Sequence, residues 1–192
     1  KVNKVKFQEN LNIINHRGPD NQGIYQDEDI IFGHNRLSIL DTNLRSSQPM
    51  SYKHLIITYN GEIYNYLEIK NKLIKKGYKF KTTSDTEVVL MAWLEWSYKC
   101  LELFEGMFAF AIWDNKTKIL FLARDKFGEK PLFWAKDNKD IIFSSELSAL
   151  INLLSFKPKI NKNNKANHKF IKNVIAVRME IIKHIKPILL TT

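Results

Sequence analysis

Three consecutive residues, Asn60-Gly61-Glu62, have types suited to chemistry at a carbonyl group. An Asn side-chain amide and a Gly backbone N–H are two neutral donors, and such a pair can hold a developing oxyanion during acyl transfer. Glu62 would place an anion near the same point, where it would suit an ammonium group. Asn-Gly is also a common turn pair, so a simple turn is the alternative interpretation of the pair alone.

Two further charged residues extend this chemistry. Arg36 follows a predicted strand, where its guanidinium group could hold a carboxylate through two hydrogen bonds; a surface salt bridge is the alternative. Asp85 falls in the first turn of a predicted helix, a position that capping and the helix dipole would by themselves explain. As a ligand, Asp85 would be a second anion for an α-ammonium group. Together these residues describe a pocket for the amide of an amino acid.

The apolar periodicity predicts the elements that would position these residues. Helices are predicted at residues 3–15, 64–76 and 145–154, with another beginning at Ser84. Strands are predicted at residues 30–34, 54–59, 107–113, 119–123, 132–135 and 141–144. The segment 41–51 is predicted to be a polar loop. Adjacent antiparallel hairpins flanked by helices favour an α+β fold and not a βαβ repeat.

Local signals mark where several of these helices begin and end. Gly77 ends the second helix, and Ser84 with Glu87 forms the pattern of a capping box ahead of an apolar run. The helix that this box opens is apolar almost all round and should be deeply buried. In the first helix, the predicted apolar side consists of Val5, Leu11, Ile13 and Ile14.

Composition and charge limit the classes of function. The net charge is +10, but residues 156–192 carry nine Lys/Arg and one Glu, a net of +8, so the remaining 155 residues carry only +2. A fold that binds a phosphate backbone should carry its charge in the body, so nucleic-acid binding is not expected. The single cysteine, Cys100, excludes an internal disulfide. No apolar run is long enough to span a membrane, and we expect a cytoplasmic protein without a metal site.

The basic end of the chain differs from the rest. Residues 1–155 are predicted to form one domain and residues 156–192 a basic linker and tail, of which 157–169 are rich in Lys and Asn. Residues 170–190 have a basic, amphipathic helical pattern. We interpret them as a tail outside the domain, with a helix attracted to anionic lipid as the less favoured alternative.

The ordered motifs of the chain resemble the class II glutamine amidotransferase domain, most closely the asparagine synthetase type. The resemblance covers about residues 5–162. The motifs that carry it are His16-Arg17-Gly18-Pro19-Asp20, Gly33-His34-Asn35-Arg36-Leu37-Ser38-Ile39, Tyr59-Asn60-Gly61-Glu62-Ile63-Tyr64-Asn65, Ser84-Asp85-Thr86-Glu87, Gly106-Met107-Phe108-Ala109-Phe110-Ala111, Arg124-Asp125-Lys126-Phe127-Gly128-Glu129-Lys130-Pro131-Leu132 and Ser144-Ser145-Glu146.

The resemblance implies a fold and a set of roles. The fold would be a four-layer αββα sandwich of two antiparallel sheets, the N-terminal-nucleophile hydrolase type. Asn60 and Gly61 would form the oxyanion hole, Glu62 and Asp85 would bind the amine of glutamine, and Arg36 its carboxylate. The pocket would also be lined by Leu37, Ser38, Ile39 and Leu40. We assign no chemistry to residues 106–114 or 124–132, which we interpret as a core strand and an orienting turn.

The resemblance also concerns cofactors and partners. No cofactor is expected in this domain, whereas ATP and magnesium belong to the synthetase half of the family, which amidates aspartate with the ammonia released from glutamine. Members of the family are often homodimeric. This sequence contains no Ser-Gly-Gly, the start of the pyrophosphate loop of that half, so we expect the synthetase half to lie outside it.

One departure concerns the nucleophile, which in the family is a cysteine at the start of the mature chain. Residue 1 here is Lys, and Cys100, between helical segments, fits a buried structural thiol. We therefore expect the strand that bears the cysteine to be missing and this polypeptide alone to release no glutamate. A glutamine-binding or interaction module without catalysis is the alternative function, and an unstable gene fragment is a third interpretation.

Overall fold

A computed structural model describes residues 4–37, 43–158, 174–178 and 188–191 of the chain. Its helices are α1 (Lys4–Ile13), α2 (Tyr66–Lys75), α3 (Asp85–Trp96) and α4 (Leu147–Leu153), with 3-10 turns at Asn15–Arg17, Leu44–Ser46 and Ser97–Glu102. Its strands are β1 (Asn21–Gln26), β2 (Ile31–Arg36), β3 (Met50–Tyr52), β4 (Leu55–Ile63), β5 (Gly106–Asp114), β6 (Ile119–Arg124), β7 (Phe133–Asp137), β8 (Asp140–Ser144), β9 (Val174–Arg178) and β10 (Ile188–Thr191).

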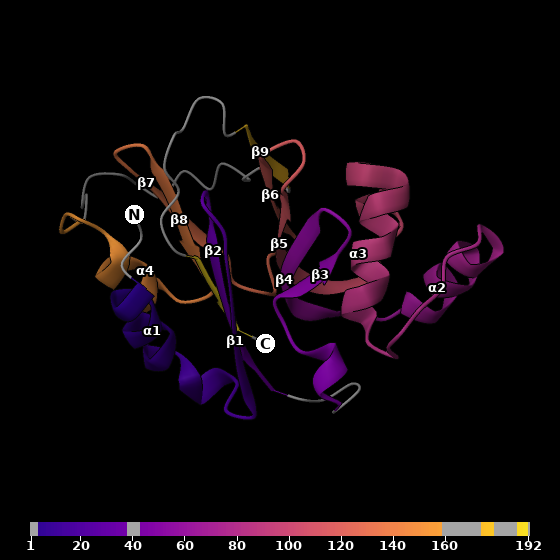
Figure 1. The fold of residues 1–192 in the computed structure, drawn as a ribbon, viewed down its shortest axis with the longest axis horizontal. Coiled ribbons are helices and arrows are strands. Elements are labelled where there is room, and N and C mark those ends of the chain that lie inside the picture. Colours follow the sequence, from indigo (N-terminus) through magenta and orange to yellow (C-terminus); the bar gives the residue numbers. More distant parts are fainter. Residues whose placement is uncertain (1–3, 38–42, 159–173, 179–187, 192) are drawn as a thin grey trace.

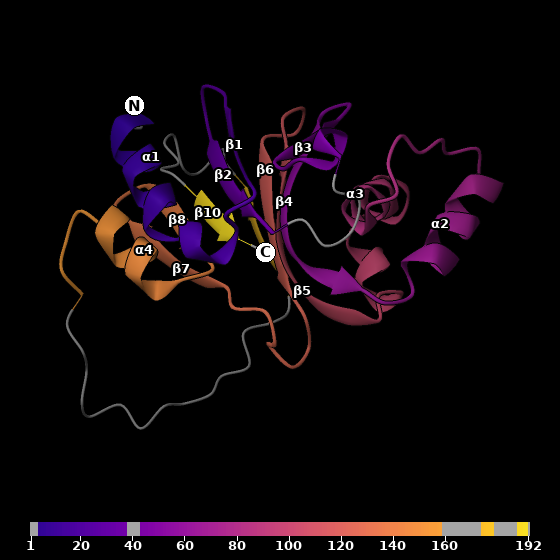
Figure 2. The ribbon, with the colours of Figure 1, turned by 90° about the horizontal axis from the view of Figure 1, so that it is seen from below.

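The strands form two five-stranded sheets that pack face to face. One sheet has the order β1-β2-β10-β8-β7 and the other the order β3-β4-β5-β6-β9. Helices α1 and α4 cover the outer face of the first sheet, and α2 and α3 cover the outer side of the second (Figures 1 and 2). The predicted α+β sandwich of four layers, αββα, is therefore confirmed.

Three apolar clusters fill the spaces between these layers. Phe32, Trp113 and Phe143 belong to the cluster between the two sheets. A second cluster joins α1 and α4 to the first sheet, and a third joins α2 and α3 to the second. Helix α3 is buried from Asp85 to Trp93, as its continuous apolar run predicts.

Helix α1 exposes part of the predicted apolar side. Val5 is 67% exposed and Ile13 is 43% exposed, so these two residues of the predicted apolar side do not belong to the core. Phe7, Leu11 and Ile14 are fully buried instead. Residues four and three positions apart lie on one helical face, and the face that begins with Phe7 carries the largest side chain of the helix.

Strand β4 is longer than predicted and includes the Asn-Gly-Glu run. It pairs with β5 without interruption from Leu55 opposite Asp114 to Ile63 opposite Gly106. Asn60 and Gly61 therefore lie within a strand, and the turn interpretation is wrong. The segment 41–51, predicted as a loop, contains the beginning of β3, and β1 was not predicted because its mixed polar residues have no clear alternation.

The basic tail contributes one strand to each sheet. Strand β9 pairs antiparallel with β6, and β10 lies between β2 and β8 and is parallel to both. At these strands the structure departs from the helical pattern of residues 170–190. Both segments are rich in β-branched residue types, and strand edges offer them backbone partners. The rest of the linker and tail, like residues 38–42, lies outside the described residues.

Candidate functional site

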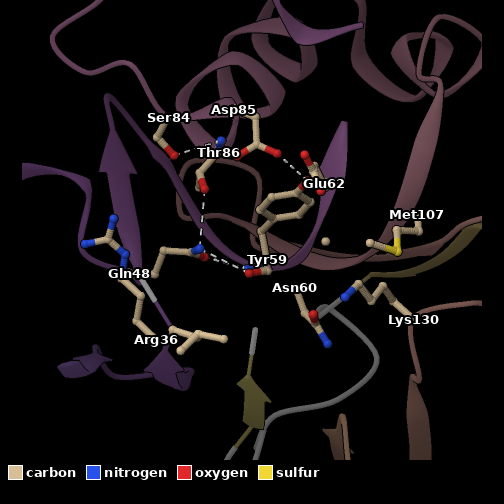
Figure 3. Close-up of a pocket in the computed structure, with 12 residues that line it drawn as sticks. Arg36, Gln48, Tyr59, Asn60, Glu62, Ser84, Asp85, Thr86, Met107 and Lys130 are labelled. Atoms are coloured by element: carbon tan, nitrogen blue, oxygen red, sulfur yellow. Dashed lines mark hydrogen bonds between the residues drawn. The ribbon is translucent and has the colours of Figure 1, made fainter. Parts of the chain in front are cut away.

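A pocket opens where β2 ends, over the second half of β4 and the first turn of α3. Twelve residues line it: Arg36, Leu37, Gln48, Tyr59, Asn60, Gly61, Glu62, Ser84, Asp85, Thr86, Met107 and Lys130. Figure 3 shows that they come from segments far apart in the sequence. The structure thus brings together every predicted site residue that it describes, whereas Ser38, Ile39 and Leu40 lie outside the described residues.

The Asn60 side chain is completely buried and has no hydrogen-bond partner. Both its amide nitrogen and its amide oxygen are unpaired among the described residues. Leaving a buried polar group without a partner costs about 1–3 kcal/mol, and unpaired buried groups are rare in folded proteins. The amide is therefore a donor held ready at the pocket for a group that the fold itself does not supply.

Gly61 sits where the backbones of β4 and β5 come very close together. A Cβ added at Gly61 would lie 2.3 Å from the carbonyl oxygen of Met107 and 2.7 Å from the Cα of Phe108. These distances are far inside van der Waals contact, so the position accepts only glycine. A glycine at this position lets β4 run close to β5, so that the Gly61 backbone, the second expected donor, lies in the strand that lines the pocket.

Asp85 lies at the N-terminus of α3, with its carboxylate held by two donors from β4. The Tyr59 hydroxyl donates to Oδ2 at 2.7 Å, and the Ile63 N–H donates to the same oxygen at 3.1 Å. Burial raises the pKa of Asp85 above its ordinary value, although both these donors oppose the shift. Burial and the neighbouring Asp85 raise the pKa of Tyr59 well above its ordinary value, so Tyr59 stays protonated as the donor.

The predicted capping box at the start of α3 is only half formed. The Ser84 hydroxyl accepts a hydrogen bond from the Thr86 N–H at 3.1 Å, as an N-cap residue does. Glu87 does not reach back to Ser84. Its carboxylate accepts from the Thr82 N–H at 2.8 Å and the Thr82 hydroxyl at 2.7 Å, because the preceding loop folds under the helix and offers nearer donors.

The other two charged residues of the predicted site differ in exposure. Glu62 lines the pocket and is half-buried. Arg36 is the last residue of β2 and is only 5% exposed, and one guanidinium nitrogen donates to the Asn43 carbonyl at 3.3 Å. Leu37, which follows, lines the pocket and is 42% exposed. The site therefore has a cation at one side and two acids near α3.

Gln48 is a site residue that the sequence did not reveal. Its side-chain amide accepts from the Tyr59 N–H at 2.7 Å and donates to the Tyr59 carbonyl at 3.1 Å, with a further contact to the Thr86 hydroxyl at 3.3 Å. The amide thereby acts as a backbone partner for β4 immediately before Asn60. It lies in a segment predicted as a polar loop, where no spacing or pattern distinguishes it.

The remaining pocket residues were also not predicted as site residues. They are Tyr59, Ser84, Thr86, Met107 and Lys130. Tyr59 and Ser84 could have been found because they are direct neighbours of predicted site residues. Met107 and Lys130 belong to motifs that were interpreted as a core strand and a turn. The pairing of β4 with β5 places Met107 opposite Glu62, and Lys130 reaches the pocket from the loop that follows β6.

His34 and Cys100 do not line the pocket. Burial, with a smaller effect of Arg36, lowers the pKa of His34 to about 3, and its Nδ1 lies 3.2 Å from the Thr58 hydroxyl. Cys100 is fully buried in the cluster under α3, and this burial raises its pKa to about 12. Among the described residues, no group of three or more His, Cys, Asp or Glu is placed to hold a metal ion. Nor does any described helix have the length and apolar character needed to cross a membrane.

Residues 1–191 match the family model described as a glutamine amidotransferase domain. Among curated proteins, the chain is 39% identical over 150 residues to glutamine-hydrolysing asparagine synthetase 3 of Bacillus subtilis, covering 76% of this chain and 24% of that protein. It is 44% identical over 141 residues to asparagine synthetase 1 of the same organism, covering 72% of this chain and 22% of that protein. The chain thus spans about a quarter of the length of these relatives.

A solved structure shares the fold at lower sequence similarity. Glutamine phosphoribosylpyrophosphate amidotransferase from B. subtilis, complexed with ADP and GMP, superimposes with a TM-score of 0.54 at 22% identity. The match covers 69% of this chain and 36% of that chain. At this level of identity the similarity shows a shared fold and nothing further.

Proposed function

This chain belongs to the glutamine amidotransferase domain family and is of the asparagine synthetase type, and we propose that its pocket binds glutamine for hydrolysis to glutamate and ammonia. The observation that carries the proposal is the fully buried, unpaired amide of Asn60 beside Gly61. Such a pair of neutral donors suits the oxyanion that forms when a carboxamide is attacked.

The charges around this pair match the other groups of glutamine. Arg36 would bind the α-carboxylate, and Glu62 and Asp85 would bind the α-ammonium group. These three contacts would leave the side-chain carboxamide to reach Asn60 and Gly61. Attack on the carboxamide carbon then places the negative charge on its oxygen, the C–N bond breaks, and ammonia leaves; water supplies the oxygen of the new carboxylate.

The nucleophile of this reaction is not assigned to Cys100. That thiol is buried among the apolar side chains under α3 and keeps its proton, because burial raises its pKa to about 12. A reactive cysteine needs a thiolate at neutral pH. The burial of Cys100 favours, as a second candidate, a glutamine-binding module that performs no hydrolysis within these 192 residues.

The fate of the ammonia rests on the relatives. Because the relatives are named glutamine-hydrolysing asparagine synthetases, a longer protein carrying this domain would use the ammonia to amidate aspartate. ATP and magnesium would then bind in a part of that protein beyond this chain. No residue described in the structure is assigned to either of them.

Glutamine binding measured by isothermal titration calorimetry tests the proposal. The 192-residue chain should bind L-glutamine, and Arg36→Ala should weaken binding at least tenfold because the carboxylate loses its partner. Arg45→Ala is the matched control, since Arg45 is exposed and does not line the pocket. No glutamine binding by the unmodified chain, or equal binding by Arg36→Ala, would overturn the proposal. Glutamate release, measured in parallel, separates hydrolysis from the binding module.

A further inference from the structure

We propose that Lys130 is a further substrate-contacting residue, a cation that favours negative charge at the side-chain end of the ligand. The inference rests on the proposed glutamine pocket and adds a fourth charged residue to it. The ligand chemistry is an oxyanion or carboxylate on the γ-carbon, as in the tetrahedral intermediate or in the product glutamate.

The Lys130 side chain reaches the pocket from a loop that carries none of the predicted site residues. It lines the same pocket as Asn60, Gly61 and Met107. Figure 3 shows the Lys130 amino group directed toward Asn60, on the side of Asn60 away from Arg36. Within the part of the chain that the structure describes, the amino group has no hydrogen-bond or ion-pair partner. It is therefore a charge available to a ligand.

The loop 124–130 holds the Lys130 backbone through Asp125. One oxygen of this buried carboxylate accepts from the Lys130 N–H at 3.1 Å and from the Phe108 N–H at 3.2 Å, and the other accepts from the Glu129 N–H at 2.9 Å. The Asp125 N–H in turn donates to the Phe108 carbonyl at 2.8 Å. Burial acts to raise the pKa of Asp125, but these backbone donors outweigh it and lower the pKa below its ordinary value.

Phe108 connects this loop to the oxyanion pair. It lies directly opposite Gly61 in the β4–β5 register. Asp125 thus ties Lys130 to the residue that faces the expected oxyanion donor, with only backbone and one carboxylate in between. We describe Asp125 as a positioning residue, because it acts on the ligand only through Lys130.

Arg124 fixes the other side of the loop. Its Nε donates to the Lys130 carbonyl at 2.7 Å, and a terminal guanidinium nitrogen donates to the Gly128 carbonyl. Gly128 has a φ of +68°, and a Cβ there would lie 2.8 Å from the Arg124 Cζ. The residues of the motif Arg-Asp-x-x-Gly-x-Lys therefore hold the loop in the conformation that places the Lys130 side chain at the pocket.

The charges of the pocket are then divided along the ligand. Glu62 and Asp85 are acidic and suit the ammonium group, whereas Lys130 faces the carboxamide, which is neutral in the substrate and anionic after attack and in the product. A cation at this end attracts the charged forms more than the neutral one, as Coulomb's law requires. Binding of glutamate and glutamine should therefore respond differently to the loss of the Lys130 charge.

Calorimetric titration of the chain with L-glutamine and with L-glutamate tests this inference. Lys130→Gln should weaken glutamate binding about tenfold and glutamine binding less than twofold, and Lys130→Arg should keep most of the glutamate affinity. Lys126→Gln is the matched control, because Lys126 lies in the same loop but is exposed and does not line the pocket. Added salt should weaken glutamate binding in the unmodified chain more than in Lys130→Gln.

The outcomes separate this inference from the proposed function. If the unmodified chain binds glutamine but Lys130→Gln changes both affinities equally, or neither, Lys130 has no charge-specific role and only the inference fails. If Lys126→Gln has the same effect as Lys130→Gln, the effect is a general one of surface charge, and the inference again fails. If the unmodified chain binds neither ligand, the proposed glutamine pocket fails, and the inference fails with it.

Discussion

The two ends of the pocket hold their polar groups in opposite ways. At the end near α3, the Asp85 carboxylate already accepts hydrogen bonds from Tyr59 and Ile63. At the opposite end, the Asn60 amide is buried and has no partner among the described residues. The first arrangement suits a charge that a ligand carries at all times, because a fixed anion can be supported by the fold. The second suits a charge that appears only during reaction.

The buried amides of Gln48 and Asn60 show the same contrast within one residue class. Gln48 is 4% exposed, and its side-chain amide forms hydrogen bonds with the backbone N–H and carbonyl of Tyr59. Asn60 follows Tyr59 in β4 and is 0% exposed, and its side-chain amide has no hydrogen-bond partner among the described residues. The fold thus satisfies the amide that shapes the strand and leaves the amide at the pocket unsatisfied. Preorganised donors of this kind need no rearrangement when charge develops.

The largest expected effect is the loss of stability caused by a methyl group at Gly61, at the end of the pocket that would receive the carboxamide of glutamine. Gly61→Ala would place a Cβ 2.3 Å from the Met107 carbonyl oxygen, and the clash with backbone cannot be relieved by a side-chain rotation. We expect a loss of about 3 kcal/mol in the free energy of unfolding and a fall in Tm of roughly 6–12 °C for a chain of this size. Thermal unfolding followed by circular dichroism measures it.

Gly77→Ala is the control for this prediction. Gly77 also has a positive φ, +91°, but no atom lies within 4 Å of an added Cβ. Its cost should be limited to backbone strain of about 1 kcal/mol. Equal losses for the two variants would contradict the close approach of β4 and β5 that defines the pocket floor.

The fold and most of the site were predictable because they rest on local signals. The capping residue Ser84 and the apolar run that follows it predict a buried α3, which places Asp85 at the α3 end of the pocket. The pairs β5–β6 and β7–β8 were predicted from their apolar runs and the short polar turns between them. Arg36 could be placed because it follows an apolar strand.

The unpredicted parts depend on contacts between segments distant in sequence. Gln48 reaches Tyr59 across the β3–β4 connection, and Lys130 reaches the pocket only because Asp125 binds Phe108 of another strand. The helical period seen in 170–190 was overridden at Val174–Arg178 and Ile188–Thr191, where strand partners exist. No local pattern encodes such contacts, so each appears only once the sheets are assembled.

An intermediate effect is expected on glutamine affinity when Asp85, at the α3 end of the pocket, is protonated. Burial raises the pKa of Asp85, and the ligand's ammonium group needs the ionised form. As pH falls through this raised pKa, a proton competes with the ligand, so glutamine affinity should fall up to tenfold per pH unit. The fall should begin at a higher pH than for an ordinary Asp. Calorimetry at a series of pH values measures it.

Asp85→Asn tests the assignment of this pH effect. The variant should bind glutamine at least tenfold more weakly at neutral pH and lose the part of the pH dependence that comes from Asp85. The stability of the variant should not fall together with its glutamine affinity. A raised carboxyl pKa means that ionisation destabilises the fold, so the neutral isostere should be at least as stable at pH 7. A stability loss, or an unchanged pH profile, would contradict the assignment.

The smallest expected effect is the change in the free energy of unfolding when the Asn60 side chain is removed. Asn60→Ala removes an amide whose burial without a partner costs about 1–3 kcal/mol, and this gain offsets the packing lost with the side chain. The free energy of unfolding should therefore change by less than about 1 kcal/mol. Gln48→Ala, the other buried amide, should lose about 2–3 kcal/mol because it leaves the Tyr59 N–H and carbonyl without their partners. Urea unfolding of both variants compares the two, and a larger loss for Asn60→Ala would mean that its amide is bonded within the fold and is not reserved for a ligand.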